Sequence, residues 1–292
     1  MREAKTTDVF LLLLLGVIWG SSFFNIKIAT YSFQPYTLAL IRVVLATITL
    51  LVVSFFLDIK IYAFSKKWKT YALVGLCNIA IPFSLIAIGT NKVDSYLAAI
   101  LMSTTPMSGL ILAHFFTKDE KITFFKSIGI ILGFCGVLLL FFDRLIINES
   151  NYLFALIILL GSTFYSIGGI IILKKLKKSG NLNVTTSTLI WSFIFLLPVS
   201  FIFEDPLSSS PTFKSILSLV YLGVIATGFA WWLRYKILIK NGLVFQTQVA
   251  YLIPIFGVIF GSLILKEQIT WKVLTSLVII IAGIYIVKKH NK

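Results

Sequence analysis

The side chains of this chain that could do chemistry are few and scattered. They comprise two histidines, His114 and His290, two cysteines, Cys77 and Cys135, and 11 carboxylates. A metal site needs several such ligands at close spacing, and covalent catalysis needs a nucleophile beside its base. The sequence offers neither arrangement, and it has no GxxxxGK[ST] phosphate-binding loop. We therefore predict no catalytic residue, no metal, no cofactor and no enzymatic activity.

Two cations stand out because they fall inside long apolar runs. A cation in such a place, as at Lys27 and Arg42, needs a partner or must reach the interface. One interpretation is structural: each cation pairs with backbone carbonyls or with a loop acid such as Asp94. The other is that Arg42 makes bidentate contacts to a carboxylate or phosphate of a ligand.

The composition places these residues in a lipid bilayer. The chain has 292 residues, of which 58% are hydrophobic and 13% are charged, and its mean hydropathy is +0.98. Soluble domains are roughly 45–50% apolar and about 25% charged. One soluble core could not bury such an excess, which excludes a soluble enzyme, a nucleic-acid-binding module and a disordered chain, although the net charge is +15.

A membrane-spanning helix needs about 20 mostly apolar residues, and this chain holds ten such runs. The predicted fold class is therefore an all-α integral membrane protein. Of the 26 Lys and Arg residues, 18 fall on the side that holds both termini and 6 on the other, which predicts cytoplasmic termini. The predicted spans are residues 9–29, 36–57, 70–90, 95–117, 124–142, 151–173, 184–203, 215–236, 243–265 and 271–288.

The chain reads as two copies of one five-helix unit. Gly75 and Pro106 recur as Gly223 and Pro254, in both cases 148 residues later. Because five is odd, the second copy must enter the membrane from the opposite face. Inverted repeats of this kind have two nearly equivalent packings, with a ligand site between the halves near mid-membrane. This pattern predicts a transporter.

Several motifs carry a family resemblance over residues 10–287. They are Trp19-Gly20-Ser21-Ser22-Phe23 with Lys27, Arg42, the small-residue run from Leu97 to Pro106, and the repeat ends at Glu120 and Glu267. In these motifs and their order the chain resembles the EamA-type ten-helix carriers of the drug/metabolite transporter superfamily. The resemblance implies a bacterial cytoplasmic-membrane protein that exports amino acids, related metabolites or drugs. It assigns residues 1–146 and 147–292 to two EamA-like repeats. A departure is Phe164-Tyr165, where the family commonly has a second Trp.

The resemblance also implies which helices surround the substrate: the first, third, fourth, sixth, eighth and ninth. Their aromatic rings, hydroxyls and amides suit a neutral or zwitterionic metabolite, and the prolines at matching mid-span places suit a gate or hinge. A competing interpretation puts Trp231 and Trp232 in an interfacial belt and the hydroxyls in helix packing. The candidate substrate-binding residues are Trp19, Ser22, Asn25, Arg42, Asn78, Ser103, Tyr165, Trp231, Tyr235, Gln246 and Tyr251, and the candidate gate residues are Pro106 and Pro254.

We expect a secondary-active or facilitative transporter of small metabolites that works by alternating access. All 11 carboxylates lie at span ends or in loops, so we do not expect protonation of a buried Asp or Glu to drive transport. His114, at the inner end of its span, is expected to face lipid headgroups. The alternatives are a lipid flippase, which needs a cavity open to lipid, and a membrane-embedded transferase, which needs clustered acids or histidines. The expected partners are a small-molecule substrate and the lipid bilayer, without nucleic acid, in a monomer or homodimer.

Overall fold

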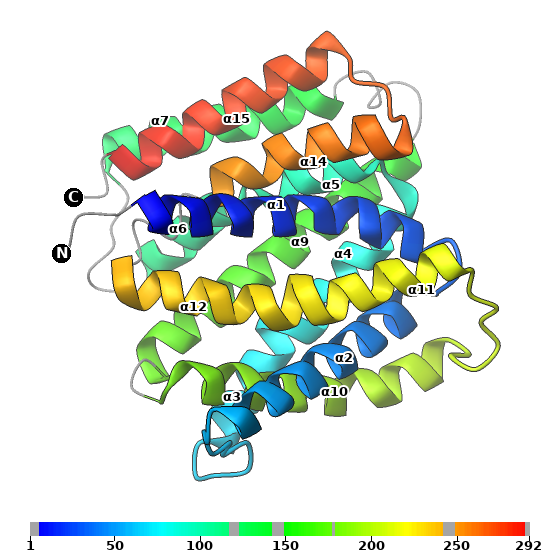
Figure 1. Cartoon of the computed structure of the whole chain (residues 1–292). Helices are drawn as coiled ribbons and strands as arrows, with labels where there is room; N and C mark the ends of the chain where they lie inside the picture. The colour runs from blue at the N-terminus through cyan, green and yellow to red at the C-terminus, as the bar shows by residue number, and fades with distance from the viewer. Residues whose placement is uncertain (1–5, 117–122, 142–148, 177–178, 242–248, 290–292) are drawn as a thin grey trace.

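The computed structural model describes residues 6–116, 123–141, 149–176, 179–241 and 249–289, and these form ten helical rods laid side by side (Figure 1). This confirms the predicted all-helical membrane fold. Apolar runs form helices here because a helix satisfies its own backbone hydrogen bonds in lipid. The first five rods are α1 (Thr6–Ala29), α2 (Pro35–Phe56), α3 (Trp68–Val74) with η1 (Gly75–Ala80) and α4 (Ile81–Lys92), α5 (Ser95–Met102) with α6 (Thr105–Phe116), and α7 (Phe124–Phe141).

The second five rods repeat this plan. The third rod of each set contains a π-helical segment at the same place, η1 in the first set and η3 in the second. The second five rods are α9 (Glu149–Ile171) with η2 (Ile172–Leu176), α10 (Asn181–Phe203), α11 (Phe213–Val220) with η3 (Tyr221–Phe229) and α12 (Ala230–Asn241), α14 (Val249–Leu265), and α15 (Trp271–Lys289).

Over the described residues, six rods are long and apolar enough to cross a membrane by themselves. The fourth rod differs from the single span predicted over 95–117, because its helix is broken at Ser103 and Thr104, between α5 and α6. The six long segments are Thr6–Ala29, Pro35–Phe56, Trp68–Lys92, Leu153–Ile171, Asn181–Phe203 and Phe213–Arg234.

The seventh rod begins earlier than the predicted span at 184. Its polar first turns are buried rather than exposed, and Asn183 explains how. The Asn183 side-chain oxygen accepts a hydrogen bond from the Tyr62 backbone amide at 2.7 Å, and its amide group donates to the Tyr71 hydroxyl at 3.1 Å. A polar helix start is therefore stable here because protein groups replace water as hydrogen-bond partners.

The two sets of five rods are inverted relative to each other. Successive rods run in alternate directions, so α1 begins and α15 ends on the same side of the bundle, at the left of Figure 1. The loop after the second rod of each set shows the inversion most plainly. Residues 57–67 lie at the left of Figure 1, whereas the equivalent residues 204–212 lie at the right.

Packing between the sets follows the same symmetry. The third rod of the first set packs through η1 against α10, and its counterpart packs through η3 against α2. The fourth rod, α5 with α6, packs on α9, and its counterpart α14 packs on α1. The fifth rods α7 and α15 pack on each other. Each half therefore completes the core of the other.

Glycine permits the closest of these contacts. A Cβ atom on Gly75 would lie 2.6 Å from the Thr188 carbonyl oxygen of α10. A Cβ atom on Gly223 would lie 2.5 Å from the Leu45 Cβ of α2. The repeated glycine noticed in the sequence is thus the point where the third rod of each half touches the second rod of the other.

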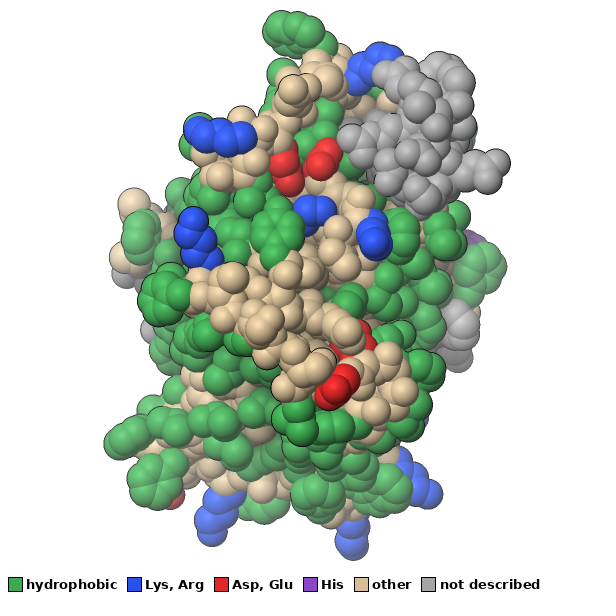
Figure 2. Space-filling view, turned by 90° about the vertical axis from the view of Figure 1, so that its right-hand side faces the viewer, with side chains coloured by type: hydrophobic (Ala, Val, Ile, Leu, Met, Phe, Trp, Pro, Cys, Tyr) green, Lys and Arg blue, Asp and Glu red, His purple; other side chains and the backbone are tan. Residues whose placement is uncertain are grey.

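The surface matches a bilayer environment. Large apolar side chains midway along the rods, such as Ile131, Leu156 and Val278, are exposed. The end of the molecule opposite the termini carries Lys and Arg side chains together with Asp and Glu (Figure 2). An apolar flank with charges at an end is the distribution that lipid and water impose on a spanning protein.

Candidate functional site

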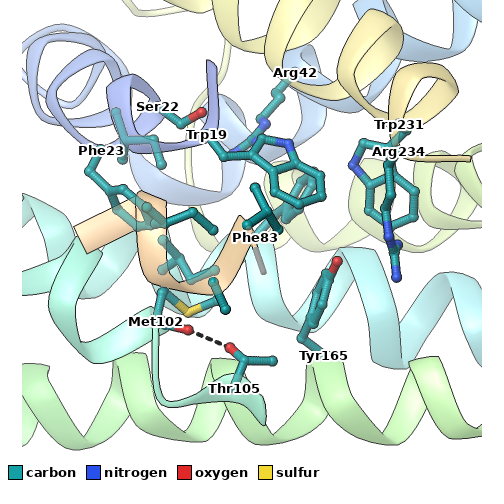
Figure 3. Close-up of a pocket in the computed structure, with 15 residues that line it drawn as sticks. Trp19, Ser22, Phe23, Arg42, Phe83, Met102, Thr105, Tyr165, Trp231 and Arg234 are labelled. Atoms are coloured by element: carbon teal, nitrogen blue, oxygen red, sulfur yellow. Dashed lines mark hydrogen bonds between the residues drawn. The ribbon is translucent and has the colours of Figure 1, made fainter. Parts of the chain in front are cut away.

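A cavity of about 250 Å³ lies within the bundle, bounded by rods of both halves (Figure 3). Its walls combine aromatic and aliphatic side chains with two arginines, a hydroxyl from Ser22 and another from Thr105. Pockets for small molecules are typically apolar with a few polar groups that fix orientation. The lining residues are Trp19, Ser22, Phe23, Ile26, Arg42, Phe83, Ile86, Met102, Thr105, Tyr165, Trp231, Arg234, Val249, Ala250 and Ile253.

Arg42 is the most buried charged group in the cavity wall, with 7% of its surface exposed. Its Nε donates a hydrogen bond to the Thr227 hydroxyl at 2.8 Å, and its guanidinium carbon lies 4.0 Å from the centre of the Phe83 ring. The hydroxyl and the ring hold the guanidinium in place, and its two terminal NH₂ groups make no hydrogen bond to a residue that the structure describes.

Arg234 is the second cation in the wall. Its guanidinium carbon lies 5.2 Å from the centre of the Trp231 ring, one turn earlier on α12. Its Nε atom is buried and has no hydrogen-bond partner among the residues that the structure describes. A buried donor without a partner is costly, so this atom marks a place where a ligand group or water can bind.

The π-helical segments position the aromatic residues of the cavity. In η3, the Ala226 carbonyl accepts a hydrogen bond from Trp19 Nε1 on α1 at 3.1 Å, while Thr227 accepts the bond from Arg42. In η1, Asn78 donates from Nδ2 to the Tyr165 carbonyl of α9 at 2.6 Å. Each π segment therefore holds the first rod of the other half beside the cavity. π-helical segments often occur at functional sites because they redirect side chains and free backbone groups.

The structure brings five of the predicted substrate-binding residues together at the cavity. Tyr165 and Trp231 make an edge-to-face contact with ring centres 6.3 Å apart. Trp231 is 4% exposed and faces this interior space, so it does not belong to an interfacial belt. The five residues are Trp19, Ser22, Arg42, Tyr165 and Trp231.

Three other predicted residues lie outside the lining. Asn25 donates to the Ser21 carbonyl at 2.9 Å, and the Ser103 hydroxyl donates to the Ile100 carbonyl at 2.6 Å, so both are satisfied within their own helices. The Asn78 amide group makes the helix contact with Tyr165 described above, while its Oδ1 is buried without a hydrogen-bond partner among the described residues. The side-chain donors of these three residues are therefore taken up by backbone oxygens rather than by a ligand.

The remaining predicted residues are partly outside the described structure. Gln246 lies in the undescribed range 242–248, and the side chains of Tyr235, Tyr251 and Pro106 are also not described. On the backbone, Pro106 is the second residue of α6, directly after the break between α5 and α6. Pro254 is buried within α14, which continues through it, next to the lining residue Ile253.

Sequence reasoning missed most of the apolar lining and assigned no role to Arg234. A signal was available on α1, where Trp19, Ser22, Phe23 and Ile26 follow the helical spacing of one face. For Arg234, the signal was its position within an apolar span. The residues missed are Phe23, Ile26, Phe83, Ile86, Met102, Thr105, Arg234, Val249, Ala250 and Ile253.

A polar cluster ties the rods together at the end opposite the termini. Lys27 donates from Nζ to the carbonyls of Asn91 and Val93, at 3.0 and 2.9 Å. Glu267 accepts from the Ser95 backbone amide at 2.7 Å and from the Ser95 hydroxyl at 2.9 Å, at the start of α5. The Lys27 ammonium is therefore bound by backbone carbonyls, which is a structural role. Lys27 does not line the cavity.

Ten rods in two inverted halves around a shared central cavity are the architecture of a membrane transporter. The model of the EamA-like transporter family matches this chain twice, at residues 6–142 and 153–288. The chain belongs to the EamA-like transporter family, and it is a multi-pass membrane transporter.

Curated relatives agree with this assignment. The uncharacterized transporter YoaV of Bacillus subtilis (strain 168) is 24% identical over 270 residues, covering 92% of each chain. The uncharacterized inner membrane transporter YedA of Escherichia coli (strain K12) is 26% identical over 270 residues, covering 90% of this chain and 84% of YedA. A solved crystal structure matches with a TM-score of 0.72 and 13% identity, covering 97% of this chain and 98% of the other, which supports the fold alone.

Proposed function

We propose that this protein carries small metabolites across a bacterial cytoplasmic membrane by alternating access, with its cavity as the substrate site. The observation that carries this proposal is the composition of the cavity wall, to which both inverted halves contribute. Trp19 and Arg42 come from the first half, and Tyr165 and Trp231 come from the second. A rocking motion of one half against the other would therefore change access to all of them together.

The proposed orientation in the membrane and the proposed energy source follow from the charges. The excess of Lys and Arg on the side of the termini supports cytoplasmic termini. The lining contains no Asp or Glu among the residues described. Protonation of a carboxylate in the cavity is therefore not part of the proposed cycle, and we assign the protein to facilitated transport or exchange, with export of amino acids, related compounds or drugs as its task.

Transport by purified protein tests this proposal. Thermal-shift screening against a metabolite library identifies ligands, because a ligand bound only by the folded state raises the melting temperature. Each ligand is then loaded into proteoliposomes at high concentration, and uptake of trace labelled ligand from outside is followed. We expect counterflow that persists when the proton gradient is collapsed. Binding without counterflow, or uptake that requires the proton gradient, would contradict the proposed function.

A matched pair of variants connects transport to the cavity. Trp231→Ala removes a buried aromatic wall and should abolish most counterflow. Trp271→Ala removes an aromatic side chain that is 83% exposed at the start of α15, and it should leave counterflow unchanged. Equal effects of the two substitutions would remove the cavity from the proposed transport path.

A further inference from the structure

The described wall of the cavity carries positive charge without a compensating negative charge. Arg42 and Arg234 both line it, and among the described lining residues there is no Asp or Glu. The contacts of Arg42 are the Thr227 hydroxyl and the Phe83 ring, both of them neutral. Arg234 contacts the neutral Trp231 ring, and its Nε has no partner within the described structure. Buried charges are normally paired, and the residues that the structure describes supply no opposite charge at this site.

Two of the aromatic faces at the cavity are already occupied by cations. The Arg42 guanidinium carbon lies 4.0 Å from the centre of the Phe83 ring, and the Arg234 guanidinium carbon lies 5.2 Å from the centre of the Trp231 ring. Aromatic rings could otherwise attract an ammonium or other cationic ligand. Here a cationic ligand would have to compete with two resident cations for those faces and would be repelled by both. Competition for these ring faces and charge repulsion therefore both disfavour binding of a cationic ligand.

We propose that the substrate of this cavity is a compact organic anion, with a carboxylate or similar acid group and an apolar body. This proposal rests on the proposed function, in which the cavity is the substrate site, and among the substrates named there it selects acidic compounds over zwitterionic amino acids. The acid group would bind the free terminal NH₂ groups of Arg42, whose fork geometry suits two parallel hydrogen bonds. The apolar body would lie against Trp19, Tyr165 and the aliphatic residues of the wall.

Arg234 would act as the second anchor. Its unpartnered Nε can donate to a further oxygen of the ligand, which favours acids that carry a second acid, keto or hydroxyl group. The ammonium of a zwitterion would find no carboxylate in the described lining. This differs from the neutral or zwitterionic ligand expected from the sequence, because the sequence did not indicate that Arg42 and Arg234 line one cavity. The cavity volume of about 250 Å³ fits a ligand below drug size.

The direct test compares ligands that share a body and differ in charge. Phenylpyruvate and phenylacetate are the aromatic acids, phenylacetamide is the neutral control, phenylalanine is the zwitterion and phenethylamine is the cation. An aliphatic set of 3-methylbutanoate, its amide and 3-methylbutylamine covers a smaller body. Binding is measured by thermal shift and by titration of the purified full-length protein. We expect at least one acid to bind on the order of tenfold more tightly than its amide, as one charge-assisted pair provides.

Variants assign the preference to the two arginines. Arg42→Gln and Arg234→Gln keep side chains of similar length and should each reduce the acid-to-amide preference, with Arg42→Lys intermediate. Lys214→Gln removes the same charge from an exposed position on α11 and is the matched control that should leave the preference intact. The comparison of acids with their matched amides and amines on the wild-type protein tests the proposal even if Arg42→Gln fails to fold.

The outcomes separate this proposal from the proposed function. Tighter binding of an amine or zwitterion than of its matched acid, or stabilisation by none of the acids, would overturn the anion proposal. An acid preference that survives both Arg→Gln substitutions would overturn it too. Counterflow of an amine would refute the anion proposal while supporting transport. Acid binding without any counterflow would support the anion proposal while refuting the transport cycle.

Discussion

At the scale of single residues, the cavity depends on how two arginines are held without acids. Arg42 reaches across from α2 to Thr227 in η3, so the first half supplies the charge and the second half supplies its acceptor. Trp19 is held in the same way, because its indole donates to the Ala226 carbonyl. The position of each of these side chains therefore depends on how the halves pack together. Substitution of its hydrogen-bond partner should alter ligand binding although the side chain itself is still present.

Thr227→Val tests this dependence. Valine has nearly the shape of threonine, and Thr227 is fully buried, so the substitution removes an acceptor and leaves the volume. The Nε of Arg42 then loses its partner, which costs about 1–3 kcal/mol for a buried donor. We expect a lower melting temperature and weaker ligand binding. Thr227→Ser keeps the hydroxyl and should bind ligand almost as the parent does, and identical binding by Thr227→Val would show that Arg42 does not need this contact.

At the scale of the elements, the π-helical segments are the joints between the halves. Each lies in the third rod of its half, packs on the second rod of the other half, and holds the first rod of the other half beside the cavity. A π segment breaks the regular helical register, so it gives the rod a place to bend. The glycines at these joints, Gly75 and Gly223, allow the close approach.

Gly75→Ala and Gly223→Ala should therefore destabilise the protein. The added methyl would lie 2.6 Å from the Thr188 carbonyl in one case and 2.5 Å from the Leu45 Cβ in the other. Overpacking of this kind costs about 1–3 kcal/mol. Gly169→Ala is the control, since no atom lies within 4 Å of its added methyl. The readout is the melting temperature in detergent, and an equal drop for all three variants would contradict the close-packed joint.

We expect the contacts of Glu267 to act as a latch, which keeps the cavity closed at the end opposite the termini. Glu267 ties α14's end to the start of α5 through the Ser95 amide and hydroxyl. Glu267→Gln weakens these charge-assisted bonds. We expect a cysteine in the cavity, Thr105→Cys, to react several-fold faster with an impermeant thiol reagent added from that end.

Glu204→Gln is the matched control for the latch. Glu204 also accepts hydrogen bonds at a helix start, from the Tyr36 and Thr37 backbone amides of α2. This contact joins the second and seventh rods rather than the rods that end at the Glu267 cluster. Faster labelling in the Glu204 variant only, or in neither variant, would exclude Glu267 as the latch.

At the scale of the whole molecule, inversion of the halves puts equivalent loops on opposite sides of the membrane. The loops 57–67 and 204–212 follow equivalent rods, yet they lie at opposite ends of the bundle in Figure 1. Lys66 and Ser208 are exposed in these loops. In cells, Lys66→Cys should react with an impermeant thiol reagent only after the cytoplasm is opened, and Ser208→Cys should react from outside. The reverse pattern would contradict cytoplasmic termini.

The sequence predicted the architecture better than the site. The repeat of Gly75 at Gly223 predicted paired halves because a spacing along the chain needs no knowledge of packing. Arg42 was singled out since a cation in an apolar run is conspicuous. Arg234 is also a cation within an apolar span and contacts Trp231 on its own helix, but its place in the cavity wall exists only after the rods associate. Asn25 was expected at the cavity, yet its helix supplies the acceptor that its amide needs, and no sequence pattern distinguishes these cases.

Accessibility of the cavity from the two sides of the membrane tests the central claim most directly. Thr105→Cys, in a background with Cys77→Ala and Cys135→Ala, places one thiol at the cavity wall. An impermeant thiol reagent is added to one side or the other of sealed, oriented vesicles. Alternating access predicts modification from either side, slower modification when substrate is present, and no passage of the reagent across the membrane. Modification from one side only, whether or not substrate is present, would contradict it.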